Sequence, residues 1–138
     1  MGPRASLEHA LLRGVHVLVV DDDAETRDLL HAVLTYCGAH VSAAESARGA
    51  LATLNRMRPD VIVCDLVMPG DDGYALVRAV RIRAAVRDVP VVALTAYGFA
   101  HDAAHVLSAG FDVYLRKPVE PRELCRTIDT LRRRTSSA

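Results

Sequence analysis

Five apolar runs alternate along the chain with five segments in which apolar residues recur at helical spacing. Most of the runs are continuous rather than alternating, which is typical of parallel strands covered on both faces. We therefore predict strands at residues 15–20, 40–44, 61–65, 89–95 and 113–116. Alternating strands and helices predict an α/β fold, a five-stranded parallel doubly wound sheet with right-handed crossovers and helices on both faces.

The segments between the runs carry apolar side chains at spacings of three and four, which predicts amphipathic helices. The first helix has a stripe of Leu29, Val33 and Cys37, reinforced by Leu30 and Leu34. The core positions expected in later helices are Leu51 and Leu54, then Leu76, Val77 and Val80, then Leu124, Ile128 and Leu131, with a weaker Ala-rich helix near 100–109.

Polar residues and glycine mark the helix boundaries. Asp22 or Asp23 can cap the first helix and Ser46 the second, Gly110 can end the fourth, and Glu120 before Pro121 suits the start of the fifth. We expect a single domain at 15–134, preceded by an extension or linker at 1–14 and followed by a tail at 135–138.

Composition narrows the function classes. The 17 basic and 17 acidic residues balance to a net charge of +0, which gives no electrostatic reason to expect nucleic acid or an anionic membrane as partner. Aromatic residues are only 4% with no Trp, so a base-stacking platform is not expected. No apolar stretch approaches the ~18 residues of a membrane span, and the N-terminus lacks a hydrophobic signal segment.

The cysteines are Cys37, Cys64 and Cys125, far apart in sequence and without zinc spacing. We expect them to be reduced and packed as small apolar groups, which fits a cytoplasmic protein.

Four predicted strands end in reactive polar groups: Asp21-Asp22, Asp65, Thr95 and Lys117. In doubly wound sheets, ligands bind beyond the carboxyl ends of the strands, so these groups should converge. Carboxylates crowded at one edge repel each other, and Mg²⁺, which takes oxygen ligands, would relieve that repulsion. The sequence therefore predicts a cation and phosphate site at this edge.

The ordered motifs resemble the receiver domain of two-component signalling, the response-regulator family, over about residues 14–134. The resemblance rests on the acidic strand end at 17–22, the loop at 65–73, Leu94-Thr95-Ala96 and the Lys-Pro at 117–118. It implies a flavodoxin-like strand order of 2-1-3-4-5. Asp71 departs from the family pattern and has no role assigned.

The resemblance implies that Asp65 is the phosphorylation site. It also implies that Asp21, Asp22, Asp65 and the backbone carbonyl of Val67 hold Mg²⁺, with Mn²⁺ as an alternative. The phosphoryl group would contact Thr95, Ala96 and Lys117.

Further roles follow from the same resemblance. Thr95 and Tyr114 would act as a switch, moving a surface formed by the fourth helix, the fifth strand and the fifth helix. Val67 and Tyr97 would tune hydrolysis, and the Lys117–Pro118 peptide would be cis. The phosphodonor would be a histidine kinase or a histidine phosphotransfer domain, and the output partner is open. The domain would catalyse only its own phosphorylation and slow dephosphorylation, so we do not expect an enzyme.

Two alternatives stay open from the residues. One is a haloacid-dehalogenase-like phosphatase, which also uses an Asp nucleophile together with a Thr and a Lys, and Asp21-x-Asp23, Thr95 and Lys117 imitate this set. The order of the motifs speaks against it, because that family has its second acidic pair after the Lys, whereas Asp65 precedes Lys117. A flavodoxin-like nucleotide binder would need a Gly/Ser/Thr-rich loop after the first strand, where three aspartates would repel phosphate.

Overall fold

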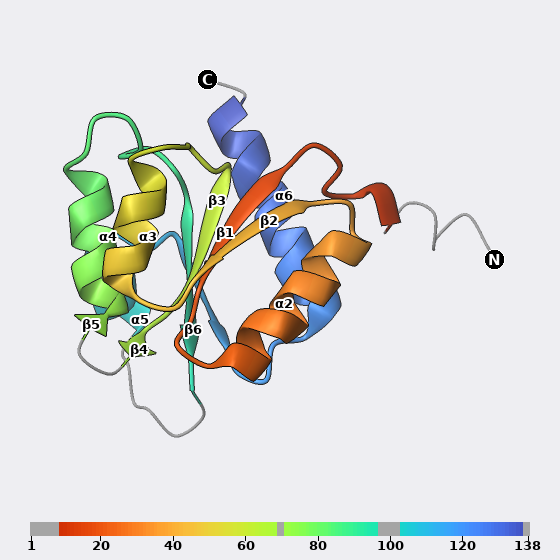
Figure 1. Ribbon diagram of the computed structural model, residues 1–138, viewed down its shortest axis with the longest axis horizontal. Coiled ribbons are helices and arrows are strands. Elements are labelled where there is room, and N and C mark those ends of the chain that lie inside the picture. Colours follow the sequence, from red (N-terminus) through yellow and green to blue (C-terminus); the bar gives the residue numbers. More distant parts are fainter. Residues whose placement is uncertain (1–8, 69–70, 97–102, 137–138) are drawn as a thin grey trace.

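The computed structural model describes residues 9–68, 71–96 and 103–136 (Figure 1). Five parallel strands form the main sheet in the order β2-β1-β3-β6-β7. They are β1 (His16–Val20), β2 (His40–Ala44), β3 (Val61–Asp65), β6 (Val91–Thr95) and β7 (Val113–Arg116). Numbered along the chain this is 2-1-3-4-5, which confirms the predicted doubly wound fold and its strand order.

Helices cover both faces of this sheet (Figure 1). They are α2 (Ala24–Tyr36), α3 (Ala47–Leu54), α4 (Gly73–Arg81), α5 (Ala103–Ser108) and α6 (Pro121–Ser136). Residues of α2 and α6 share one core cluster, and residues of α3, α4 and α5 share the other. A two-residue antiparallel ribbon of β4 (Val67–Met68) and β5 (Asp71–Asp72) was not expected from the sequence.

The central strand β1 shows why the apolar runs are continuous. Val17 and Val19 lie in the core beneath α2 and α6, whereas Leu18 and Val20 lie in the core beneath α3 and α4. All four side chains are 0% exposed, because successive residues of a strand point to opposite faces and both faces are covered.

Two local predictions were wrong. Leu29 was placed in the buried stripe of the first helix, but it is 60% exposed. The buried residues of α2 are Leu30 and Leu34, and Leu29 points about 100° away from Leu30 around the helix axis. The strand predicted from 89 begins at Val91, because the N–H of Val89 closes a turn onto the carbonyl of Val86 and Pro90 has no N–H to donate.

The helix boundaries follow the predicted caps. Asp23 accepts the backbone N–H of Thr26 at 3.2 Å and its hydroxyl at 2.6 Å, so Asp23 rather than Asp22 caps α2. Ser46 accepts the N–H of Gly49 at 3.0 Å, and Glu120 accepts two N–H groups at the start of α6. These caps fix where α2 and α6 begin, directly after the strand ends that carry the polar groups.

The segment before β1 is joined to the helical layer. Leu12 is 0% exposed and its N–H donates to the carbonyl of Cys37 at 2.8 Å. This contact anchors the C-terminal end of α2 from outside the sheet. Within the described residues, no helix combines the length and apolar character needed to cross a bilayer.

Candidate functional site

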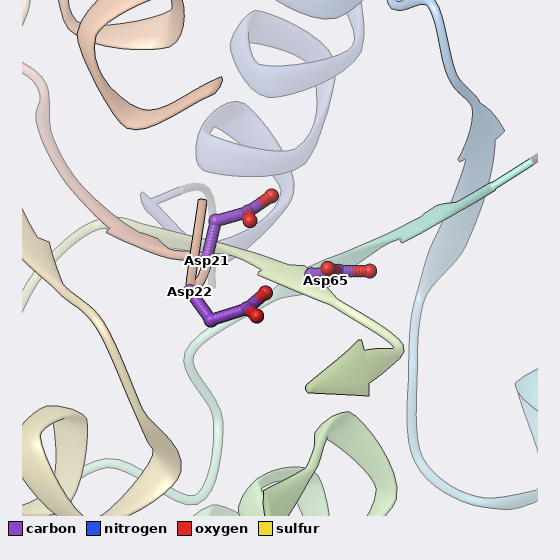
Figure 2. Close-up of side chains that lie close together, drawn as sticks. All are labelled: Asp21, Asp22 and Asp65. Carbon is purple, nitrogen blue, oxygen red and sulfur yellow. The ribbon is translucent and has the colours of Figure 1, made fainter. Parts of the chain in front are cut away.

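Three aspartates converge at the carboxyl ends of β1 and β3 (Figure 2). One carboxylate oxygen from each of Asp21, Asp22 and Asp65 lies within 4.8 Å of the others. Asp21 is 0% exposed and Asp65 is 7% exposed, whereas Asp22 is exposed to solvent. The predicted acidic cluster is therefore formed, with one carboxylate facing water and two held in the domain.

Asp21 is held on every side by the protein. Its Oδ1 accepts the N–H of Asp23 at 2.9 Å, and its Oδ2 accepts the Nζ of Lys117 at 2.8 Å. Its backbone carbonyl accepts an N–H of Arg27 at 2.8 Å. Both carboxylate oxygens of the buried Asp21 therefore have a hydrogen-bond partner, which offsets the cost of removing them from water.

Asp65 is held less tightly. Its Oδ1 accepts the N–H of Val67 at 3.2 Å, and its Oδ2 lies 3.4 Å from the Nζ of Lys117. Burial raises the pKa of Asp65 and the charge of Asp21 adds to this, while the Lys117 ammonium and the Val67 N–H oppose it. The contacts to the Asp65 carboxylate are thus longer than those to the Asp21 carboxylate.

Lys117 supplies the positive charge of the site. Burial lowers the pKa of Lys117, but the hydrogen bond that its ammonium donates to Asp21 and the charges of Asp21 and Asp65 outweigh burial, so the pKa is raised and the ammonium is retained. Its backbone N–H donates to the carbonyl of Thr95 at 2.8 Å, which fixes the start of the side chain. The Lys117–Pro118 peptide is cis, as predicted.

The other predicted site residues lie around this cluster. Thr95 ends β6 and is 5% exposed, and Ala96 follows it half-buried. Val67 is 43% exposed beside Asp65. Tyr114 is half-buried in β7 and packs against the core beneath α3, α4 and α5. Tyr97, predicted to tune hydrolysis, lies outside the described residues.

Cys64 lies one residue before Asp65 and faces the opposite side of β3. It is 0% exposed and belongs to the core beneath α3, α4 and α5, as strand alternation predicts. Its thiol donates to the carbonyl oxygen of Asp65 at 3.2 Å, so it supports the backbone of the site without entering it.

Two residues that shape the site were missed. The carbonyl contact of Arg27 could not be found from the sequence, because an Arg on α2 looks like any solvated cation. Gly73 matched the family loop only by position. In the structure, a Cβ on Gly73 would lie 2.6 Å from the carbonyl oxygen of Asp65, and the Gly73 N–H donates to the carbonyl of Leu66 at 3.0 Å.

Gly73→Ala should therefore displace the backbone at Asp65. We expect overpacking against a rigid backbone atom to cost about 1–3 kcal/mol, measured by urea unfolding. The matched control is Gly49→Ala, because a Cβ there would meet side-chain atoms alone, the Oγ of Ser46 at 3.3 Å and the Cβ of Ala44 at 3.8 Å. It lies inside α3, where Ala is favoured over Gly by about 1 kcal/mol. Equal unfolding free energies for the two variants would contradict the close approach at Gly73.

The cluster suits a hard divalent cation. Mg²⁺ is bound in proteins by one or two carboxylates together with water and phosphate oxygens, and here three carboxylate oxygens lie within 4.8 Å of one another. Asp22, the exposed member, is the carboxylate of the cluster most open to an entering ion. The spacing and chemistry of these donors fit the group that the sequence predicted.

Comparison with known proteins agrees with this geometry. A family model described as the response regulator receiver domain matches residues 17–129. A 14.6 kDa protein from the sodA1 3′ region of Leptolyngbya boryana is 44% identical over 85% of this chain and 89% of its own length. The phosphate regulon transcriptional regulatory protein PhoB of Klebsiella pneumoniae is 38% identical over 87% of this chain, which spans only 52% of PhoB.

A solved structure shows the same fold. The receiver domain of the sensor histidine kinase PA1611 from Pseudomonas aeruginosa PAO1 superposes with a TM-score of 0.79 at 32% identity, covering 86% of this chain and 98% of that one. That structure has a magnesium ion coordinated in its active-site cleft. With the family match over most of the chain and the polar groups at the strand ends, this protein belongs to the response regulator receiver domain family.

Proposed function

We propose that this domain accepts a phosphoryl group on Asp65 from a histidine kinase or a histidine phosphotransfer domain. Phosphorylation then transmits the signal by changing the conformation of the domain's surface. The observation that carries this proposal is the placement of the Lys117 ammonium 2.8 Å from Asp21 and 3.4 Å from Asp65 at the mouth of an acidic cluster. Neither a helix cap nor a solvated acid requires an ammonium opposite it, whereas phosphoryl transfer uses fixed positive charge to neutralise the phosphoryl oxygens.

In the transfer, an Asp65 carboxylate oxygen attacks phosphorus, an O–P bond forms, and the P–N bond of the donor phosphohistidine breaks with its electron pair returning to the imidazole. Lys117 neutralises charge on the phosphoryl oxygens, and the Thr95 hydroxyl and Ala96 N–H donate hydrogen bonds to them. Bound Mg²⁺, or Mn²⁺ in its place, would neutralise the remaining charge. We assign its ligands as Asp21, Asp22, Asp65 and the carbonyl of Val67.

The signal would leave through the surface of α5, β7 and α6. Thr95 ends β6 next to β7, where its register partner is Arg116 and Tyr114 pairs with Ala93. A hydrogen bond from Thr95 to the phosphoryl group exists only after transfer, so it shifts the population of any state in which Thr95 and Tyr114 move together.

Dephosphorylation should be slow, because Val67 beside Asp65 offers no hydrogen bond to orient an attacking water, and we assign Tyr97 a shielding role. On this proposal the domain has no turnover on external substrates, and it works in the cytoplasm, which suits a domain whose three cysteines are free thiols. Membership of the receiver family gives no support to the phosphatase alternative.

Acetyl phosphate with Mg²⁺ is expected to add one phosphoryl group per chain, and the increase in intact mass measures this addition. Chelation of the metal with EDTA should abolish the addition, because the acidic cluster alone repels the phosphodonor. A chain that instead released many equivalents of inorganic phosphate would be a phosphatase, and labelling that persisted in EDTA would overturn the metal requirement.

A further inference from the structure

Two thiols far apart in the chain meet on the side of the domain opposite Cys64. Cys37 caps the C-terminal end of α2 and Cys125 lies in α6. Their Sγ atoms are 3.0 Å apart although the residues are 88 positions apart in sequence. The structure holds both as buried thiols rather than as a disulfide, and both belong to the core beneath α2 and α6.

The backbone fixes Cys37 beside Cys125. The N–H of Cys37 donates to the carbonyls of Leu34 and Val33 at 3.1 and 3.3 Å, and its own carbonyl accepts the N–H of Leu12 at 2.8 Å. A disulfide has an S–S separation of about 2.0 Å, so the two sulfurs need to approach by only about 1 Å to bond.

The pair can be reached from outside. A groove of about 390 Å³ is lined by both cysteines together with Leu11, Tyr36, Arg122 and Arg126. Cys37 is 7% exposed and Cys125 is 2% exposed, so Cys37 is the more accessible of the two buried residues that line the groove. The two arginines place positive charge on the walls, which favours an anionic reagent such as glutathione disulfide.

Cys64 shows what a purely structural cysteine looks like in the same protein. It is 0% exposed, it does not line this groove, and its thiol points to the carbonyl oxygen of Asp65. Small apolar packing explains Cys64 completely. It does not account for two thiols that meet beside a groove, where the thiol of Cys125 donates to the Sγ of Cys37 at 3.0 Å.

We propose that Cys37 and Cys125 form a redox site that closes to a reversible disulfide on reaction with a low-molecular-mass disulfide. One cysteine thiolate attacks the reagent and releases one thiol, leaving a mixed disulfide on the protein. The second thiolate attacks that mixed disulfide, forms the Cys37–Cys125 bond and releases the second reagent thiol. Two protein thiols lose two electrons to the S–S bond of the reagent, and their protons end on the two released thiols. The product ties the end of α2 to α6.

The test uses the whole chain with glutathione disulfide under native conditions. Titration of thiols after denaturation should fall from the three of the sequence to one, and the intact mass should fall by two hydrogen atoms. Peptide mapping should join Cys37 to Cys125 in a monomer, and dithiothreitol should restore all thiols. Closing so long a loop should raise Tm by about 10 °C.

Matched variants separate the pair from the third thiol. Cys64→Ala should still form the disulfide, leaving no titratable thiol, whereas Cys37→Ala and Cys125→Ala should form no intramolecular bond. The wild-type peptide map gives the answer even where a variant fails to fold. A thiol count that stays at three, a stable glutathione adduct as the end product, or a disulfide between two chains would each overturn the proposal.

Discussion

Asp65→Asn is expected to abolish phosphoryl incorporation from acetyl phosphate in the presence of Mg²⁺. An amide oxygen is a poor nucleophile and forms no stable acyl phosphate, so the substituted side chain cannot accept the phosphoryl group. The shape of the side chain is unchanged, and the Val67 N–H can still donate to its oxygen. Because burial raises the pKa of Asp65, neutralising the group should leave the free energy of unfolding equal or higher. The measurements are intact mass and urea unfolding.

Asp23→Asn is the matched control for this experiment. It makes the same chemical change in the loop after β1, and Asn caps a helix about as well as Asp, so α2 should keep its start. Asp23 is exposed and is outside the acidic cluster. We expect it to incorporate phosphoryl as the wild type does. Labelling of Asp65→Asn, or its loss in Asp23→Asn, would move the phosphorylation site away from Asp65.

The sheet and the converging strand ends were predictable because both follow from short-range pattern. A strand buried on both faces must be apolar throughout, as Val17 to Val20 are, and a polar residue that ends such a run lies at the edge of the sheet. Parallel strands bring those edges together, so Asp21, Asp65 and Lys117 could be placed side by side without any contact information.

Other features depend on small rotations or on long-range contacts. Leu29 and Leu30 differ by one position, and only the packing of α2 decides which is buried. Glycine is needed at position 73 because a Cβ there would lie only 2.6 Å from the carbonyl oxygen of Asp65, a distance that only the folded backbone reveals. The meeting of Cys37 with Cys125 joins residues 88 positions apart, and nothing in their local sequence distinguishes them from Cys64.

Lys117→Met is expected to tighten Mg²⁺ binding while slowing phosphoryl acceptance. Met keeps the apolar stem and removes the charge. A cation entering the cluster then meets the carboxylates without a fixed positive charge 2.8 Å from Asp21 and 3.4 Å from Asp65, so the affinity for Mg²⁺ should rise about 10-fold or more. Loss of the ammonium from the transition state should lower the rate of phosphorylation about 10²–10³-fold.

The free energy of unfolding of Lys117→Met gives an independent test of the role of Lys117. Without metal, Asp21 is left 0% exposed and without its partner cation, so unfolding should become easier by about 2–4 kcal/mol, and saturating Mg²⁺ should recover much of this loss. Isothermal titration calorimetry and urea unfolding with and without Mg²⁺ measure the two effects. Arg116→Met is the control, because Arg116 is an exposed cation one residue away on β7 and should change neither. If Lys117→Met bound Mg²⁺ more weakly than wild type, Lys117 would be supporting the cation site instead of competing for its carboxylates.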